Sequence, residues 1–292
     1  MKKLLMLIGS LAVIGLLSNC GGGEPDRASS APVPAPANKL AIIGSTTLLP
    51  IAQKAVDAFQ KRNPSIKTTL TGGGSLAGIN ALTDGYADVA MSSRELKNEE
   101  KEKLRKKAKI TAKGTIVAWD GIIPIVHPSN PVKNLTIAQL KDIYTGKITD
   151  WQQVGGKKGE ILVVARDFTS GTHEAWAELV LNNEPVAKSV QEKSSSEAIL
   201  RAIESTPNAI GYDGIGIVAG DTRVKAVSVD GVAASVNSVL DKSYKIARPL
   251  YLFTSDKPNT AVTEFLALMT GPDGQALVKE AKFVPLAQNG EK

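Results

Sequence analysis

The sequence predicts an α/β protein built of two lobes, and three observations lead to this fold class. Short apolar runs typical of strands alternate with amphipathic helical patterns along most of residues 39–292. The alternation forms two successive series that divide near residue 120. A strongly β-type run at 248–254 (RPLYLFT) follows both series and suggests that the chain returns to the first lobe. We therefore expect two doubly wound lobes joined by hinge strands, with lobe 1 formed by 39–119 and 248–292 and lobe 2 by 120–247.

The first series begins with a four-residue apolar strand at 40–43, which ends in a Gly-Ser-Thr-Thr turn. Six apolar residues between positions 48 and 59 then fall on one helical face, and Asn63-Pro64 stops that helix. The same reasoning gives the other elements of this series: strands at 66–70, 88–91 and 115–118, and helices over 76–82 and the charged stretch 99–109. Strands alternating with helices imply a parallel sheet with helices on its faces.

The second series starts after Asp120-Gly121, with a strand at 122–126 and a helix that Thr136 caps. Further strands are expected at 161–165, 209–212 and 223–229, and further helices at 170–181 and 194–205. Two amphipathic helices, near 260–269 and 273–282, follow the late strand and close the body.

The first 38 residues have the pattern of an export signal and a tether. Lys2 and Lys3 precede an apolar stretch at 4–17, which is shorter than the roughly 20 residues that a membrane span needs. The following Leu-Ser-Asn-Cys resembles the bacterial lipobox, although Asn19 departs from the small residue usual before the cysteine. We expect a signal peptide at 1–19, lipid attachment at Cys20, and a Pro/Ala/Gly tether at 20–38 that is too poor in apolar residues to fold. A plain secretory signal with an incidental cysteine is the alternative.

Composition excludes several classes of protein. A single cysteine and two histidines, His127 and His173, rule out a disulfide scaffold and a Cys- or His-rich metal site. The formal net charge of +6 mildly favours anionic ligands. The densest charged run, 99–109, mixes both signs and lacks aromatic residues, which indicates a solvated helix face and no nucleic-acid partner. We expect no metal, no cofactor and no catalytic residue.

Four strand-to-helix junctions share one chemistry, because each places hydroxyl groups where a helix begins. They read GSTT at 44–47, GGGS at 72–75, SSR at 92–94 and RDFTSGT at 166–172. Helix N-termini offer unpaired N–H groups and the positive end of the helix dipole, and ligands bind outside the carboxyl ends of strands in open α/β sheets. With Arg166 as a charged fork for an oxyanion, the set predicts an anion site.

These residues also carry a resemblance to the substrate-binding lipoproteins of bacterial phosphate ABC transporters, which are periplasmic binding proteins of type II. The matching segments span nearly all of the mature body in the family's order: GSTTLLP at 44–50, TGGGSLAG at 71–78, DVAMSSREL at 88–96, DGIIPIVHPSN at 120–130, LTIAQLKDIYTGKITDW at 135–151, RDFTSGT at 166–172 and RPLYLF at 248–253.

The resemblance implies a bilobal protein that closes on inorganic phosphate in the cleft between its lobes and delivers it to the permease subunits of an ABC transporter. It also implies a monomer, held by its lipid at Cys20 on a bacterial membrane, in the periplasm or at the cell surface. By motif position, the phosphate-binding residues are Ser45, Thr46, Thr47, Ser75, Ser93, Arg94, Arg166, Ser170, Gly171 and Thr172.

One departure from the family bears on anion selectivity. Well-studied members have an Asp where this chain has Ser93, and that carboxylate accepts the proton of phosphate and excludes sulfate. Asp167 could orient Arg166 or replace the missing acceptor, and the sequence leaves both open. Another tetrahedral oxyanion, such as sulfate or molybdate, remains an alternative ligand.

Three rival interpretations belong to other functional classes. Gly72, Gly74 and Ala77 fit the dinucleotide fingerprint, but this motif is weak and an exported protein has little access to NAD. A secreted serine hydrolase could use Ser170 with His173, yet no nucleophile elbow surrounds Ser170. A structural surface lipoprotein would need neither Arg166 nor the hydroxyl-bearing loops.

Overall fold

The structure, a computed structural model, describes residues 39–286. The signal peptide, Cys20 and the tether predicted above lie outside this range. Within it, no helix is both long enough and apolar enough to cross a membrane.

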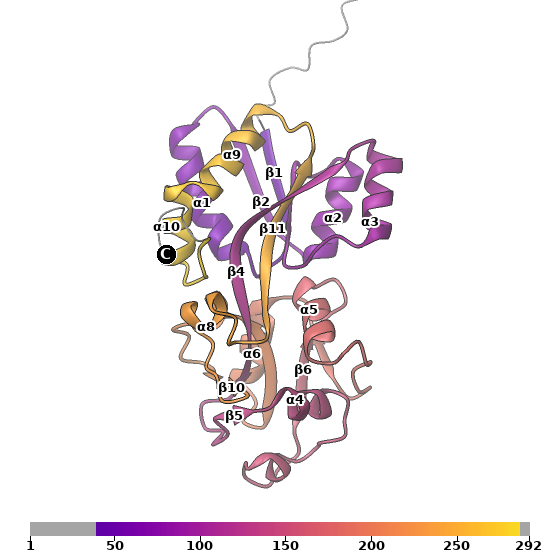
Figure 1. The fold of residues 1–292 in the computed structure, drawn as a ribbon, viewed down its shortest axis with the longest axis vertical. Coiled ribbons are helices and arrows are strands. Elements are labelled where there is room, and N and C mark those ends of the chain that lie inside the picture. Colours follow the sequence, from indigo (N-terminus) through magenta and orange to yellow (C-terminus); the bar gives the residue numbers. More distant parts are fainter. Residues whose placement is uncertain (1–38, 287–292) are drawn as a thin grey trace, which may run out of the picture. The chain divides into compact units, whose positions relative to one another are not determined.

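The first lobe contains three parallel strands in the order β2-β1-β3, flanked by helices from both ends of the described chain (Figure 1). Helix α1 starts with Pro50 in its first turn, which suits the fixed φ of proline, and it buries a stripe that includes Ile51, Ala55 and Phe59. The elements of this lobe are β1 (Lys39–Gly44), α1 (Leu49–Arg62), β2 (Lys67–Gly72), α2 (Ser75–Asp84), β3 (Val89–Ser92), α3 (Asn98–Lys103), a π-helical continuation η1 (Leu104–Ala108), α9 (Thr260–Thr270) and α10 (Pro272–Glu280).

The second lobe is formed by the middle of the chain. Its first helix begins as predicted, because the Thr136 hydroxyl accepts the backbone N–H of Gln139 at 3.0 Å while the Gln139 side chain accepts the N–H of Thr136. The elements are β5 (Asn134–Leu135), α4 (Ile137–Tyr144), the 3-10 helix η2 (Trp151–Val154), β6 (Leu162–Arg166), α5 (Gly171–Leu179), β7 (Gln191–Lys193), α6 (Ser196–Glu204), β8 (Ala209–Gly214), α7 (Ile215–Val218), β9 (Lys225–Ala226), β10 (Ser228–Val229) and α8 (Val236–Leu240).

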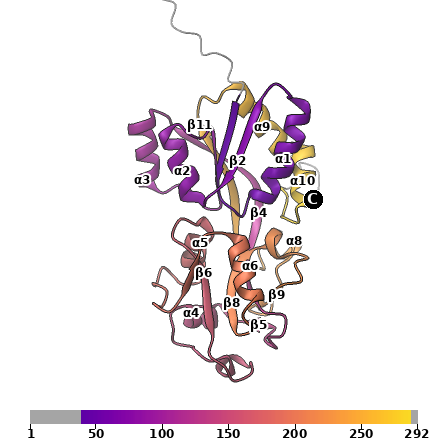
Figure 2. The ribbon, with the colours of Figure 1, turned by 180° about the vertical axis from the view of Figure 1, so that it is seen from behind.

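Two long strands, β4 (Ala112–Val126) and β11 (Ala247–Ser255), run through both lobes, as both views show (Figures 1 and 2). They pair antiparallel, β11 also pairs with β3, and β4 also pairs with β8. The late strand therefore returns to the first lobe as predicted, and one sheet with the order β2-β1-β3-β11-β4-β8-β6-β7 connects the lobes.

Two segments differ from the predicted secondary structure. The strands expected at 115–118 and 122–126 are one continuous strand, because the polar Asp120 between them pairs across the ladder with Arg248 and does not interrupt it. The strand expected at 223–229 is two short strands, β9 and β10, which pair with different partners, β4 and β5. In addition, the sheet is mixed, since β11 runs antiparallel to both of its neighbours.

An aromatic cluster fixes the position of α5 in the second lobe. The rings of Trp176 and Tyr212 stack with their centroids 4.2 Å apart, and Tyr144 packs against both. The Tyr212 hydroxyl also accepts the backbone N–H of Arg166 at 3.3 Å. This cluster therefore sets the start of α5 and the end of β6 relative to β8, and both places carry predicted site residues.

Candidate anion site between the lobes

Three serine hydroxyls from separate loops meet at the edge of the first lobe. Ser45, after β1, donates to the hydroxyl of Ser93, after β3, at 3.1 Å. The Ser93 hydroxyl lies 3.3 Å from that of Ser75 at the start of α2, and the backbone N–H of Ser93 donates to Ser75 at 3.1 Å. All three side chains are buried. The carboxyl ends of parallel strands thus bring three of the predicted residues together.

The two threonines of the first loop contact the second lobe. The hydroxyls of Thr47 and Thr172 are hydrogen-bonded at 3.0 Å. The Thr46 hydroxyl lies 3.4 Å from that of Ser196 and accepts the Ser196 backbone N–H at 3.4 Å. The predicted site residues of the two lobes therefore face one another.

Arg166, at the end of β6, brings a buried positive charge to this region and is only 1% exposed. Its Nε and Nη2 donate to the backbone carbonyls of Lys193 and Ser194 at 3.3 and 3.2 Å, and Nη1 donates to the Ser196 hydroxyl at 3.3 Å. Each terminal nitrogen of a guanidinium carries a second N–H, so the fork retains donors for an oxyanion.

The carboxylate that pairs with Arg166 is Asp213, which the sequence analysis missed. Asp213 Oδ2 lies 3.9 Å from Arg166 Nη1, and Oδ1 accepts the Ser196 hydroxyl at 3.1 Å. Asp213 is fully buried, and its Oδ2 has no hydrogen-bond donor among residues 39–286. Asp167 instead accepts the hydroxyl and the N–H of Thr169 within its own loop. Among residues 39–286 no hydrogen bond or ion pair joins the Asp167 side chain to Arg166, whereas the Ser196 hydroxyl accepts from Arg166 and donates to Asp213.

The start of α5 packs tightly on the first lobe. A Cβ atom added to Gly171 would lie 2.4 Å from Ser75 Oγ and 2.8 Å from Ser93 Oγ. Nearby, the Leu76 backbone N–H donates to the Thr169 carbonyl at 3.1 Å, and a Cβ on Gly74 would meet that same oxygen at 2.6 Å. The glycines at these positions permit a close approach of the two lobes. This explains Gly74 without a dinucleotide.

Ser170 caps α5, since its hydroxyl accepts the backbone N–H groups of Thr172 and His173 at 3.1 and 3.3 Å. A serine hydroxyl that accepts two hydrogen bonds still has its O–H to donate. His173 meets Ser170 through the backbone, which is not the contact of a nucleophile with its base.

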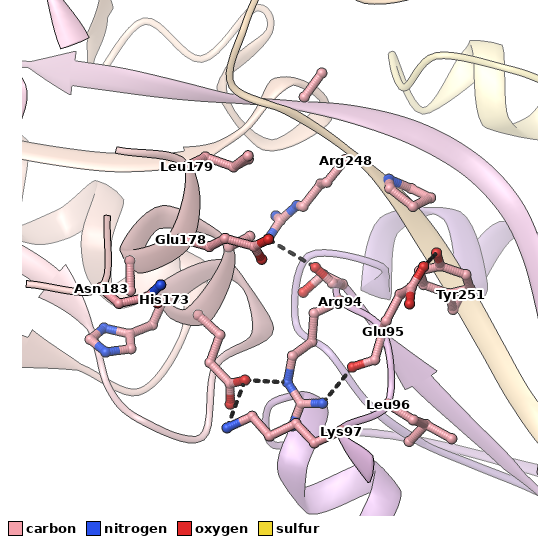
Figure 3. Close-up of a pocket in the computed structure, with 16 residues that line it drawn as sticks. Arg94, Glu95, Leu96, Lys97, His173, Glu178, Leu179, Asn183, Arg248 and Tyr251 are labelled. Carbon is pink, nitrogen blue, oxygen red and sulfur yellow. Dashed lines mark hydrogen bonds and ion pairs between the residues drawn. The ribbon is translucent and has the colours of Figure 1, made fainter. Parts of the chain in front are cut away.

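The structure does not bring the guanidinium of Arg94 to the hydroxyl groups. Arg94 points into a neighbouring groove (Figure 3), where it lies 2.8 Å from Glu174 on α5. It also donates to both oxygens of Glu100, at 2.7 and 2.8 Å. Lys97 also reaches Glu174, at 3.1 Å. Burial opposes the ionisation of Glu100, but the hydrogen bonds from Arg94 and from the Lys97 backbone keep the pKa of Glu100 below its usual value. Arg94 thus forms an ion pair across the lobes.

A second buried arginine, Arg248, lies next to the hydroxyl groups. Arg248 on β11 lines the same groove in Figure 3, and its Nη2 donates to the Thr172 hydroxyl at 2.9 Å. Arg248 was expected only as the first residue of the late β-type strand, and Asp120, Ser196 and Asp213 were not expected in the site. An arginine inside the apolar strand RPLYLF was the one available signal, because a buried arginine needs a partner.

The arrangement is suited to holding a small anion without covalent chemistry. Neither α1 nor α2 has a side-chain cap at its N-terminus, but Pro50 has no N–H, the Leu49 N–H donates to the Thr46 carbonyl and the Leu76 N–H donates to the Thr169 carbonyl. Hydroxyl groups of both lobes and the buried guanidinium of Arg166 converge here, and these are the donors that suit an oxyanion.

Comparison with known proteins gives the family. Residues 29–273 match the model of the PBP superfamily domain. This chain belongs to the PBP superfamily. The phosphate-binding protein PstS of Borreliella burgdorferi is 32% identical over 97% of this chain and 99% of its own length. PstS of Bacillus subtilis is 28% identical over 98% of this chain and 94% of its own length.

Solved structures of PBP superfamily members share the fold. A phosphate ABC transporter substrate-binding protein from Clostridium perfringens, with bound phosphate, is 35% identical with a TM-score of 0.80, covering 85% of this chain and all of that one. An ABC-type phosphate transport receptor from Vibrio cholerae is 30% identical with a TM-score of 0.69, covering 85% of this chain and all of that one. The predicted fold class and the resemblance to phosphate-binding proteins of ABC transporters are confirmed.

Proposed function

We propose that this protein captures inorganic phosphate between its lobes and delivers it to the permease of an ABC transporter. The observation that carries the proposal is Arg166, a buried guanidinium at the junction where hydroxyl groups of both lobes meet. The Clostridium perfringens relative, whose structure contains phosphate, supports the choice of ligand.

In this proposal, the first lobe donates from Ser45, Thr46, Thr47, Ser75 and Ser93. The second lobe holds the anion with Arg166, the Ser170 hydroxyl and the Gly171-Thr172 start of α5. Arg94 takes no part in binding the anion and instead joins the lobes through Glu174. A charge-assisted hydrogen bond contributes about 1.5–3 kcal/mol, so a few such bonds supply the roughly 8 kcal/mol of a micromolar complex.

The test is Arg166→Gln combined with Asp213→Asn, because removing the arginine alone would leave a buried carboxylate without its cation. We expect at least about a 100-fold loss of phosphate affinity by calorimetry, from two charge-assisted bonds at about 1.5 kcal/mol or more each. Arg201→Gln, on the exposed face of α6, is the control and should bind as the wild type does. A folded double variant with unchanged affinity would overturn the proposal.

The alternative ligands are sulfate and molybdate, and a competition titration across pH separates them from phosphate. Phosphate keeps a proton near neutral pH and can donate it to a carboxylate, whereas sulfate cannot. We expect the protein to bind phosphate in preference to sulfate and molybdate at neutral pH. A preference for sulfate at every pH would contradict the choice of phosphate while leaving an oxyanion site in place.

We further infer that the protein is a monomer that binds its ligand without catalysis. Its first lobe is formed by residues 39–119 and 248–292, and its second lobe by residues 120–247. Within residues 39–286, the chain passes between the two groups of elements through β4 and β11, which supports these boundaries. The chain would act in the periplasm or at the cell surface, anchored through Cys20. Replacing Cys20 with serine should move the protein from the membrane fraction to the soluble exported fraction, and an unchanged membrane fraction would argue against the anchor.

A further inference from the structure

Arg248 and Asp120 face each other on the two strands that pass between the lobes. They are directly opposed in the β4–β11 ladder, with Arg248 Nε and Nη2 donating to Asp120 Oδ2 at 3.1 and 2.8 Å. Asp120 is fully buried and Arg248 is 4% exposed. Two charges withdrawn from water in this way need close pairing and further hydrogen bonds.

The remaining donors of Arg248 reach one anion-site loop in each lobe. Nη1 donates to the backbone carbonyl of Ser93 at 3.2 Å, and Nη2 donates to the Thr172 hydroxyl at 2.9 Å. Ser93 belongs to the first lobe and Thr172 to the second. We propose that Arg248 is a positioning residue of the anion site, which couples the closing of the lobes to the placement of the Ser93 loop and the Thr172 hydroxyl.

Asp120 fixes the guanidinium for this task. Its Oδ1 accepts the backbone N–H of Ile215 at 2.9 Å, and a Cβ on Gly214 would lie 2.7 Å from either carboxylate oxygen. The carboxylate is therefore held at the junction of β8 and α7 in the second lobe. Because Arg248 sits on a strand common to both lobes, its bonds to Ser93 and Thr172 coexist only when the loops of the two lobes lie within reach of one guanidinium.

The planar fork of arginine suits this arrangement, since its donors point in several fixed directions. Lysine has the same charge but a single ammonium group, which cannot reach the Asp120 carboxylate, the Ser93 carbonyl and the Thr172 hydroxyl together. The hydrogen bond from Arg248 also occupies a lone pair of the Thr172 hydroxyl and so turns its O–H toward another acceptor. In the proposed function, on which this inference rests, that acceptor is phosphate, which would replace the Thr47 hydroxyl that lies 3.0 Å from Thr172 Oγ1.

A double-mutant cycle on phosphate affinity tests the inference. The pair variant Arg248→Gln with Asp120→Asn removes both charges together, so no buried charge is left unpaired. We expect it to weaken phosphate binding about 10- to 100-fold in the wild-type background, as for a lost hydrogen bond to a charged group. In a Thr172→Val background, the loss of affinity caused by the same pair variant should be at least threefold smaller than in the wild-type background, because the hydrogen bond between Arg248 and Thr172 is already absent.

The matched control is the exposed ion pair of Arg62 and Asp273, changed to Gln and Asn, which should leave affinity unchanged. Equal effects of the Arg248 pair variant in both backgrounds, or wild-type affinity in a folded pair variant, would overturn the inference. Arg248→Lys keeps the charge and gives a second test if the pair variant does not fold, with the same loss of affinity expected and wild-type affinity again refuting it. If the wild-type protein itself binds no phosphate, the proposed function fails instead.

Discussion

The tight packing of Gly171 leads to a prediction about one added methyl group. Gly171 opens α5 in the second lobe, and the nearest neighbours of a Cβ atom there are Ser75, Ser93 and Arg94, all in the first lobe. We expect Gly171→Ala to hold the lobes apart and thereby weaken phosphate binding, while the folding of each lobe is preserved, because alanine is a better helix former than glycine.

The magnitude follows from the distances. The Cβ would lie 2.4 Å from Ser75 Oγ, whereas ordinary contact begins at 3.4 Å, so the interface must open by roughly 1 Å. Turning the Ser75 or Ser93 hydroxyl away would break their hydrogen bonds and disturb two proposed ligands of phosphate. Overpacking of this kind costs about 1–3 kcal/mol, which corresponds to about a 5- to 150-fold loss of affinity if only the closed state bears it.

The assay is calorimetric titration with phosphate, together with small-angle scattering to compare the compaction that the ligand induces. Gly73→Ala is the matched control, since its Cβ would meet only Ala77 of the adjoining helix α2, at 3.3 Å, and affinity should stay within about twofold of the wild type. Wild-type affinity and wild-type compaction in Gly171→Ala would refute the idea that closure brings these surfaces together.

Two further predictions concern charges beside the site. Glu174→Gln removes the ion pair with Arg94 across the lobes, and because Glu174 is only partly buried we expect phosphate release to be about 2- to 10-fold faster in stopped-flow measurements. Glu178→Gln on the same helix is the control, and an unchanged release rate in Glu174→Gln would show that this pair does not hold the lobes. Asp213→Asn removes the negative charge 3.9 Å from Arg166, so sulfate should compete with phosphate at least about tenfold better. Unaltered competition would exclude Asp213 from anion selection.

The buried charges of the candidate site explain why the sequence pointed to some of its charged residues and not to others. Arg166 pairs with Asp213 and Arg248 with Asp120, so each buried arginine has its own carboxylate. These partners lie between 47 and 128 positions apart in the sequence, on strands whose pairing order follows from the sheet. Arg94 follows a serine in a hydroxyl-bearing loop, as expected for a site residue. Its guanidinium nevertheless pairs with Glu100, six positions later, and with Glu174.

The local pattern was sufficient for most secondary structure. The apolar stripe of α1, the Thr136 cap and the hydroxyl-bearing loops follow from periodicity and capping chemistry, which act over a few residues. The continuous strand β4 was missed because a polar Asp-Gly pair is a turn signal in a sequence. That signal is overridden when a distant arginine satisfies the carboxylate within the sheet.

The sequence by itself determined the alternation of strands and helices and the loops that carry hydroxyl groups, and it named Arg94 and Arg166 as candidate anion-binding arginines, because these patterns depend on residues close together in the chain. Only the tertiary structure decided which carboxylate faces Arg166, that Arg248 and not Arg94 lies beside Thr172, and that Gly171 packs against Ser75 and Ser93 of the other lobe. Buried charges and tight contacts are set by distances between elements remote in sequence, and the pairing order of the strands fixes those distances.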